Sequence, residues 1–125
     1  MNESNNSAAA RAVIEEYVAA CNDGSVERLK AIFHEDALMS GYMMGEYIMG
    51  SPAPFFEAVA NPPPEAPANP GNYRGEITQV EVSGPVASVT LKEAGFMGMN
   101  FTDYFHLAEV NGEWKIISKT FNPEP

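Results

Sequence analysis

Asp103 and His106 lie three residues apart in the segment "FTDYFHLAEVNGEWKIISKTF", which runs from Phe101 to Phe121. A carboxyl group and an imidazole that face one pocket can transfer protons as a general acid and a general base. The residues around them are mostly aromatic, β-branched or apolar, which is typical of strands. The pairing of these strands therefore decides whether the two side chains can act together.

An Asn-Gly dipeptide at 111–112 separates two strand-like runs, and this is the strongest short-range signal for a two-residue hairpin turn. The turn fixes the register, and side chains alternate between the two faces along each strand. In this register Asp103 pairs with Thr120 on one face, whereas His106 pairs with Ile117 on the other. The sequence thus predicts that Asp103 and His106 point to opposite faces and form no direct acid–base pair.

The more apolar face of this hairpin is expected to pack against helices. It carries Asp103 together with Phe105, Leu107, Trp114 and Ile116. The opposite face is mixed and is expected to point outward. It carries Tyr104, His106, Ile117 and Lys119, which we interpret as a candidate dimer face.

Asp103 is thereby predicted on an inner face, where a charged carboxylate without a partner is costly by several kcal/mol. It must find hydrogen-bond donors or keep its proton, and apolar surroundings raise the pKa of a carboxyl group towards neutrality. Thr120 and a tyrosine of the first helix are candidate partners. Two interpretations stay open: a hydrogen-bonded residue at the edge of the core without chemistry, and a residue that contacts a ligand.

Composition excludes several classes of partner. The net charge of -10 repels phosphate backbones and anionic lipid heads, so neither nucleic acid nor a membrane surface is an expected partner. The first twelve residues lack the basic and apolar regions of a signal peptide, and no later stretch is long and apolar enough to span a membrane. A cytoplasmic location is the expectation that follows.

Two helices are predicted at the start of the chain. Apolar residues recur at helical spacing from about Ser7 to Cys21, and Gly24 suits a left-handed cap at the end of this helix. Ser25 can cap a second, shorter helix with Val26 on its apolar stripe. Cys21 is expected to be a small core residue, because nothing beside it in the sequence would lower its pKa.

The rest of the chain predicts strands and one further helix. Residues 37–50 contain glycines that suit short strands, and residues 51–60 suit a third helix. Strands are then expected over 73–83, 86–94 and the hairpin 101–121. Helices first and antiparallel strands afterwards are the α+β order, in which the helices cover one face of a curved sheet.

With 125 residues the chain is expected to be one domain, and 45% hydrophobic residues are enough for a globular core. We assign this domain to residues 8–121. Residues 1–7 are expected to be disordered or frayed, residues 61–72, with five prolines, to form a surface loop, and residues 122–125 to form a tail.

Several segments carry a family resemblance. They are "AVIEEYVAACNDGSVERLKAIFHEDALM", a glycine-broken strand segment, a short "PFFEAV" helix and the terminal "DYFHLAEVNGEWKIISKTF" hairpin. From about Ala8 to Phe121 this pattern resembles the nuclear transport factor 2-like superfamily, and within it the SnoaL-like and "putative lumazine-binding" families. The resemblance implies a cone of three helices packed on a strongly curved, mainly antiparallel sheet, with a pocket between them and a homodimer through the outer face of the sheet.

Ketosteroid isomerase belongs to the same superfamily, and there a protonated Asp and a Tyr form an oxyanion hole. Tyr17, in "EEYVAACNDG", is similar in position to that tyrosine, and Asp103, in "TDYFHL", to that aspartate. The catalytic base of the isomerase falls at Gly41, which has no side chain to move a proton. The resemblance therefore implies a possible oxyanion-binding pair, Asp103 and Tyr17, without the isomerase base.

Three functions remain open at this point. The first is a protein that binds an unknown small molecule, apolar and ring-shaped or heteroaromatic, in a pocket with Asp103 and Tyr17. The second is an isomerase, cyclase or dehydratase that uses these two residues, and the third is a dimeric scaffold with a vestigial cavity. The expected pocket wall is Phe33, Met39, Tyr42, Phe55, Phe56, Phe105, Trp114 and Thr120.

No metal and no cofactor are expected. His34, Glu35 and Asp36 are consecutive, and consecutive residues at the end of a helix cannot all point at one ion. We interpret Asp36 as a capping or turn residue.

Overall fold

The fold places three helices on one six-stranded sheet. The structure is a computed structural model and describes residues 3–62 and 72–125. The helices are α1 (Glu3–Asp23), α2 (Val26–Ile32) and α3 (Ala53–Ala60). The strands are β1 (Phe33–Met43), β2 (Glu46–Gly50), β3 (Arg74–Ser83), β4 (Val86–Phe96), β5 (Met99–Val110) and β6 (Glu113–Glu124).

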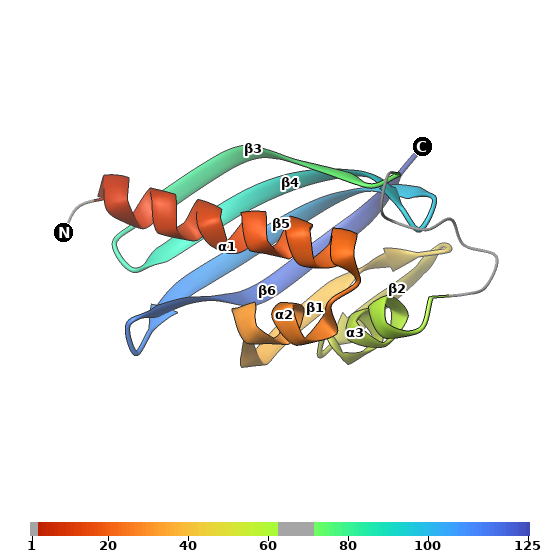
Figure 1. Ribbon diagram of the computed structural model, residues 1–125, viewed down its shortest axis with the longest axis horizontal. Coiled ribbons are helices and arrows are strands. Elements are labelled where there is room, and N and C mark those ends of the chain that lie inside the picture. Colours follow the sequence, from red (N-terminus) through yellow and green to blue (C-terminus); the bar gives the residue numbers. More distant parts are fainter. Residues whose placement is uncertain (1–2, 63–71) are drawn as a thin grey trace.

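The sheet has the order β2-β1-β6-β5-β4-β3, so β1 lies between β2 and the last strand of the chain, β6. Strands β1 and β6 pair in parallel and the other neighbours pair antiparallel. Figure 1 shows α1 lying along one face of the curved sheet, with α2 and α3 at the side of β1 and β2. The predicted α+β class, with helices on one face of a curved, mainly antiparallel sheet, is confirmed.

Local signals in the sequence account for the ends of the helices. Gly24 has a φ of +69°, the left-handed conformation that ends α1. Ser25 caps α2 by accepting a hydrogen bond from the backbone N–H of Arg28 at 3.3 Å. The hydroxyl of Ser51 accepts one from the N–H of Ala53 at 3.2 Å at the start of α3.

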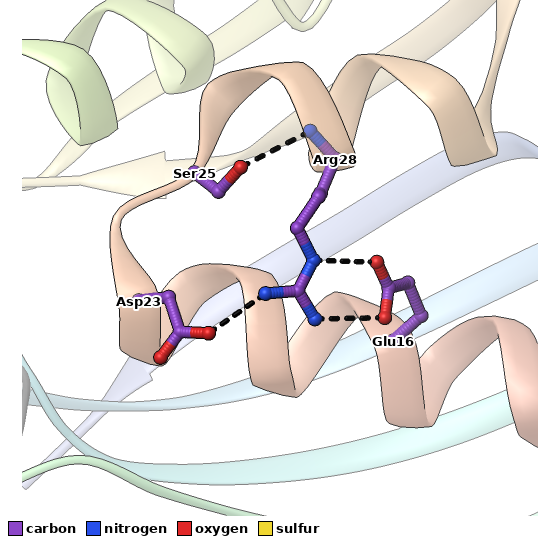
Figure 2. Close-up of polar contacts among 4 residues, drawn as sticks. All are labelled: Glu16, Asp23, Ser25 and Arg28. Carbon is purple, nitrogen blue, oxygen red and sulfur yellow. Dashed lines mark hydrogen bonds and ion pairs between the residues drawn. The ribbon is translucent and has the colours of Figure 1, made fainter.

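Arg28 also joins α1 to α2 (Figure 2). Its Nε and Nη2 donate to the two carboxylate oxygens of Glu16 at 2.7 and 2.9 Å, and Nη1 donates to Asp23 at 2.7 Å. The hydrogen bond from Arg28, the larger cause, and its positive charge lower the pKa of Glu16. This partly exposed network joins α1 to α2 through side chains.

Both ends of the ordered structure extend beyond the predicted bounds. Helix α1 begins at Glu3, and the side chain of Asn6 is buried and donates to the carbonyl of Gly84 at 2.9 Å. The prediction that residues 1–7 are disordered or frayed is therefore wrong for residues 3–7. Strand β6 continues to Glu124, so most of the predicted tail is strand. The predicted loop at 61–72 lies largely outside the described residues, since 63–71 are not described.

The terminal hairpin follows the predicted register only next to its turn. Leu107 pairs with Ile116 as expected, but His106 pairs with Ser118, so one residue of β6, Ile117, has no partner. Such a bulge reverses the faces of all residues beyond it. Asp103 consequently pairs with Phe121, and the predicted pairing with Thr120 is wrong.

No helix in the described part of the chain is long and apolar enough to cross a membrane.

Candidate functional site

A cavity of about 220 Å³ lies between α3 and the inner face of the sheet. Nine of its twelve lining residues are apolar: Met39, Met43, Ile48, Pro54, Phe55, Ala58, Phe96, Phe101 and Phe121. The other three are Glu93, Asp103 and Lys119. For scale, an engineered apolar cavity of about 150 Å³ binds benzene. The cavity therefore has the size of one small ring with substituents.

The three ionisable residues come from three adjacent strands. Glu93 on β4 pairs with Phe101, two residues before Asp103 on β5, and Lys119 on β6 pairs with Phe105, two residues after Asp103. Asp103 is thus a diagonal neighbour of both. Glu93 is 5%, Asp103 0% and Lys119 6% exposed, so the structure keeps all three groups away from bulk water.

Both carboxyl oxygens of Asp103 are buried, and no donor group among the described residues hydrogen-bonds to them. Burial raises the pKa of Asp103 well above its usual value, and the charge of Glu93 and a hydrogen bond with its carboxyl group raise it further, while Lys119 opposes the shift. These effects favour the protonated form of Asp103. At the wall of the cavity it presents a hydroxyl that can donate and a carbonyl oxygen that can accept a hydrogen bond.

Glu93 has a partner on its other side. The hydroxyl of Tyr73 donates to Oε2 of Glu93 at 2.6 Å, and both side chains are buried. Burial, and then the charge of Glu93, raise the pKa of Tyr73. Glu93 thus has a hydrogen-bond donor, Tyr73, whereas no donor group among the described residues reaches Asp103.

Lys119 reaches the cavity over a group of aromatic rings. Its Nζ lies 3.6 Å from the centroid of the Phe55 ring and 5.4 Å from the centroids of Tyr17 and Phe121. Cation–π attraction accounts for this position. The described residues include no ion pair between Lys119 and Glu93 or Asp103. The amine therefore stands at the cavity wall without an acceptor of its own.

Tyr17 lies in the core beside the cavity and is not among its lining residues. Its ring stacks on Phe55 at 5.7 Å and meets Phe105 edge-on at 4.9 Å. The hydroxyl of Tyr17 is buried, and burial, followed by the charge of Glu93, raises its pKa. No hydrogen bond joins Tyr17 to Asp103, so the structure brings the two into one neighbourhood but not into contact.

Of the predicted pocket wall, Met39 and Phe55 line the cavity. Phe33, Phe56, Phe105 and Trp114 pack in or against the core and are absent from the lining residues. Tyr42 is 51% exposed, and Thr120 is exposed and shares a hydrogen bond with Ser40 at 3.1 Å, so the prediction that these two face the pocket is wrong. Both alternate with inward-facing neighbours and lie on the outer face.

Of the predicted dimer face, Tyr104, His106 and Ile117 are exposed. The hydroxyl of Ser118 lies 3.4 Å from Nδ1 of His106 on that face. Lys119 is the exception, because the bulge at Ile117 turns it inward to the cavity. The prediction that Asp103 points inward and His106 outward is confirmed.

Comparison with known proteins gives the family. A family described as "Putative lumazine-binding" matches residues 5–122. The chain belongs to the "putative lumazine-binding" family. It is also similar to "Aldolase FrzH" from Cladobotryum sp., with 28% identity over 110 residues that cover 87% of this chain and 84% of the relative.

Solved structures agree on the fold of this "putative lumazine-binding" family member. A nuclear transport factor 2-like protein of unknown function from Silicibacter pomeroyi DSS-3 superposes with a TM-score of 0.86 and 27% identity, covering 99% of this chain and 100% of that one. A "putative dehydratase" of the same fold from Streptomyces avermitilis has a TM-score of 0.71 and 15% identity, covering 99% of both chains.

Gly41 in this family member has a structural reason to lack a side chain. A Cβ there would meet the carbonyl oxygen of Phe121 and lie 2.7 Å from its ring. Strand β1 needs this close approach because Gly41 pairs with Phe121 on β6. The position that resembles the base of ketosteroid isomerase is therefore filled by the neighbouring strand.

Sequence reasoning missed Glu93 and misplaced Lys119. Glu93 continues the inward alternation of Ala87, Val89 and Leu91, and this parity was the signal that could have found it. The signal for Lys119 was subtler. Ile116 and Phe121 are both large apolar residues of opposite parity, which requires a bulge between them if both face inward.

Proposed function

We propose that the protein binds a small ring compound carrying one polar group in the cavity beneath α3, and that Asp103 receives this polar group. The observation that carries the proposal is the fully buried carboxyl group of Asp103 at the cavity wall, to which no donor group among the described residues hydrogen-bonds. Buried polar groups in folded proteins are nearly always satisfied, and each exception needs an explanation. A ligand oxygen or nitrogen next to Asp103 is that explanation.

The shape and chemistry of the cavity narrow the ligand class. Apolar side chains form most of the wall, whereas Glu93, Asp103 and Lys119 form one polar strip across three strands. A planar ring with a carbonyl or hydroxyl on one edge fits this division, because its faces bury apolar surface and its edge meets the strip. A heteroaromatic ring, as the family description suggests, belongs to this class.

Thermal-shift and titration measurements with a panel of one-ring and two-ring carbonyl compounds, pteridines and flavins test this proposal. We expect a one-ring or two-ring compound to stabilise the wild type, and Asp103→Leu to lose this stabilisation because it removes both oxygens at similar volume. Asp36→Asn is the matched control, since Asp36 is an exposed carboxylate. A panel without any hit would favour the scaffold with a vestigial cavity, and equal binding by Asp103→Leu would refute the role of Asp103.

An enzyme that uses the same pocket is the second candidate. A protonated acid, Asp103, next to a carboxylate that accepts a hydrogen bond, Glu93, can protonate a carbonyl or a leaving hydroxyl and take a proton back. A relative is named an aldolase and a structural neighbour a "putative dehydratase". Product analysis of each bound compound over time tests turnover, and compounds recovered unchanged would leave binding alone.

We also propose that the protein forms a homodimer through the outer face of the sheet. Exposed apolar side chains gather on this face, namely Leu38, Tyr42, Tyr104 and Ile117, which are between 37% and 52% exposed. Light scattering is expected to give the mass of two chains for the wild type and of one chain for Tyr104→Glu. A wild-type mass of one chain at micromolar concentration would contradict this interface. A smaller mass at pH 5 than at pH 8 would add His106 to it.

A further inference from the structure

Lys119 differs from the other lysines of the chain in its surroundings. Lys92 donates to the hydroxyl of Thr102 at 2.9 Å, and Lys115 donates to the carbonyl of Ala31 at 2.6 Å. Lys30 lies at the surface, 5.9 Å from the centroid of the Phe56 ring. Lys119 alone among these is 6% exposed and lines the cavity, and no carbonyl or carboxylate accepts from it among the described residues.

Such an amine costs stability where it stands. A buried ammonium without a carboxylate partner is among the most unfavourable groups in a core, and cation–π attraction to Phe55 compensates for only part of this cost. An apolar residue would satisfy the packing better. The amine at this wall is therefore better explained by what it does to a ligand than by what it does for the fold.

Resting on the proposed function, we propose that Lys119 forms a reversible imine with an aldehyde or ketone group of the ring compound in the cavity, with Asp103 supplying and accepting the protons. Lysine amines in apolar pockets form such bonds with carbonyl substrates. Lys119 and Asp103 are diagonal neighbours at one wall, so a carbonyl group between them meets a nucleophile and an acid together.

The chemistry balances without an oxidant or reductant. The ammonium first loses a proton to solvent, and the free amine attacks the carbonyl carbon while the carboxylic acid of Asp103 protonates the carbonyl oxygen. The resulting Asp103 carboxylate takes one proton from the nitrogen and gives it to the hydroxyl group, which leaves as water as the C=N bond forms. The iminium ion then returns its remaining N–H proton to Asp103, which restores the carboxylic acid and leaves the neutral imine. One amine and one carbonyl compound thus give one imine and one water.

Borohydride capture tests this bond. Benzaldehyde, a single ring with one carbonyl, is incubated with the full chain at low concentration, sodium borohydride reduces any imine to a stable benzylamine, and peptide mass mapping locates the label. We expect one benzyl group on Lys119, at a rate above that of Lys30, Lys92 and Lys115 by at least about tenfold, because the cavity positions the carbonyl. Lys119→Arg, which keeps the charge, is expected to lose this label, and Lys92→Arg to keep it.

Benzyl alcohol separates this inference from the proposed function, because it offers the same ring without a carbonyl. Binding of benzyl alcohol in the cavity, with benzaldehyde label spread evenly over all lysines, would overturn the imine and leave the proposed function standing. Failure of both compounds to bind would overturn both. The wild-type label distribution alone decides the question, so the result does not depend on how well a Lys119 variant folds.

Discussion

Two charged clusters in this protein are built in opposite ways. Arg28 is partly exposed, and its guanidinium is paired with the carboxylates of Glu16 and Asp23, as Figure 2 shows. The strip of Glu93, Asp103 and Lys119 is buried, yet among the described residues no donor group hydrogen-bonds to Asp103 and no ion pair forms with Lys119. The surface charges are therefore fully paired, whereas in the buried strip only Glu93 has a hydrogen-bond donor, Tyr73.

This contrast separates structure from function. Pairing at the surface contributes little to stability, and the Arg28 network is explained by the orientation of α1 against α2. Unpaired polar groups in a core are destabilising, so they persist where a ligand or a reaction uses them. Variants that remove groups of the buried strip can therefore be compared with a variant of the surface network.

Tyr73→Phe should have the largest effect on stability. It removes the only hydroxyl that donates to Glu93 in the described structure and leaves a buried carboxylate without that donor. We expect the free energy of unfolding to fall by about 3 kcal/mol, since an unsatisfied buried charge costs more than a neutral group. Denaturant unfolding measures this change, and a loss no larger than that of an exposed Tyr47→Phe control would show that Glu93 is not charged.

Asp103→Leu should change stability in the other direction. Replacing buried ionisable groups with apolar residues of similar volume is often stabilising, so we expect the free energy of unfolding to rise by about 2 kcal/mol. The same variant is expected to lose binding of the ring compound. A marked loss of stability would instead identify Asp103 as a structural residue with a partner in the core.

The pH dependence of stability should separate the two clusters by sign. The pKa of Asp103 is raised in the folded state, so between about pH 4 and this raised pKa only the folded state holds the proton. In this range the free energy of unfolding falls by about 1.4 kcal/mol per pH unit as pH rises. The pKa of Glu16 is lowered, so its contribution is present above about pH 4 and is lost as pH falls.

Unfolding of the wild type and of Asp103→Asn across pH 4 to pH 8 measures this difference. The variant is expected to lack the falling slope, because an amide does not titrate, whereas other groups contribute equally to both proteins. Parallel curves for the two proteins would mean that Asp103 titrates normally.

Arg28→Lys should give the smallest effect. A lysine cannot bind both oxygens of Glu16 and also reach Asp23, so we expect a slight loss of thermal stability. The difference between the variant and the wild type should become smaller at high salt, because salt screens these ion pairs. Ligand binding should stay unchanged, because none of these residues lines the cavity. Loss of binding would show that the contact between α1 and α2 also affects the cavity.

The sequence predicted the fold because its signals are local. Gly24, Ser25 and the Asn-Gly turn at 111–112 each fix the backbone within a few residues, and the structure has a cap or a turn at each. The inward position of Asp103 followed from counting along β5 from that turn.

The site was harder to predict because it depends on pairing between distant strands. A single bulge at Ile117 moved Lys119 from the outer face to the cavity and Thr120 from the cavity to the outer face. Glu93 lies next to Asp103 because β4 pairs with β5, and the sequence did not show this pairing. Which buried residues line a cavity depends on how the helices pack on the sheet, and the sequence does not show this packing. Phe105, for example, was predicted in the cavity wall and lies in the core.

The most direct test of the account is the carboxyl ¹³C resonance of Asp103, followed by NMR from pH 3 to pH 9 with and without the ring compound. We expect the Asp103 signal to titrate well above the ordinary range of an aspartate and to move when the compound binds, whereas the signal of the exposed Asp36 does not respond to the compound. An Asp103 signal that titrates near pH 4 and ignores every compound would contradict it.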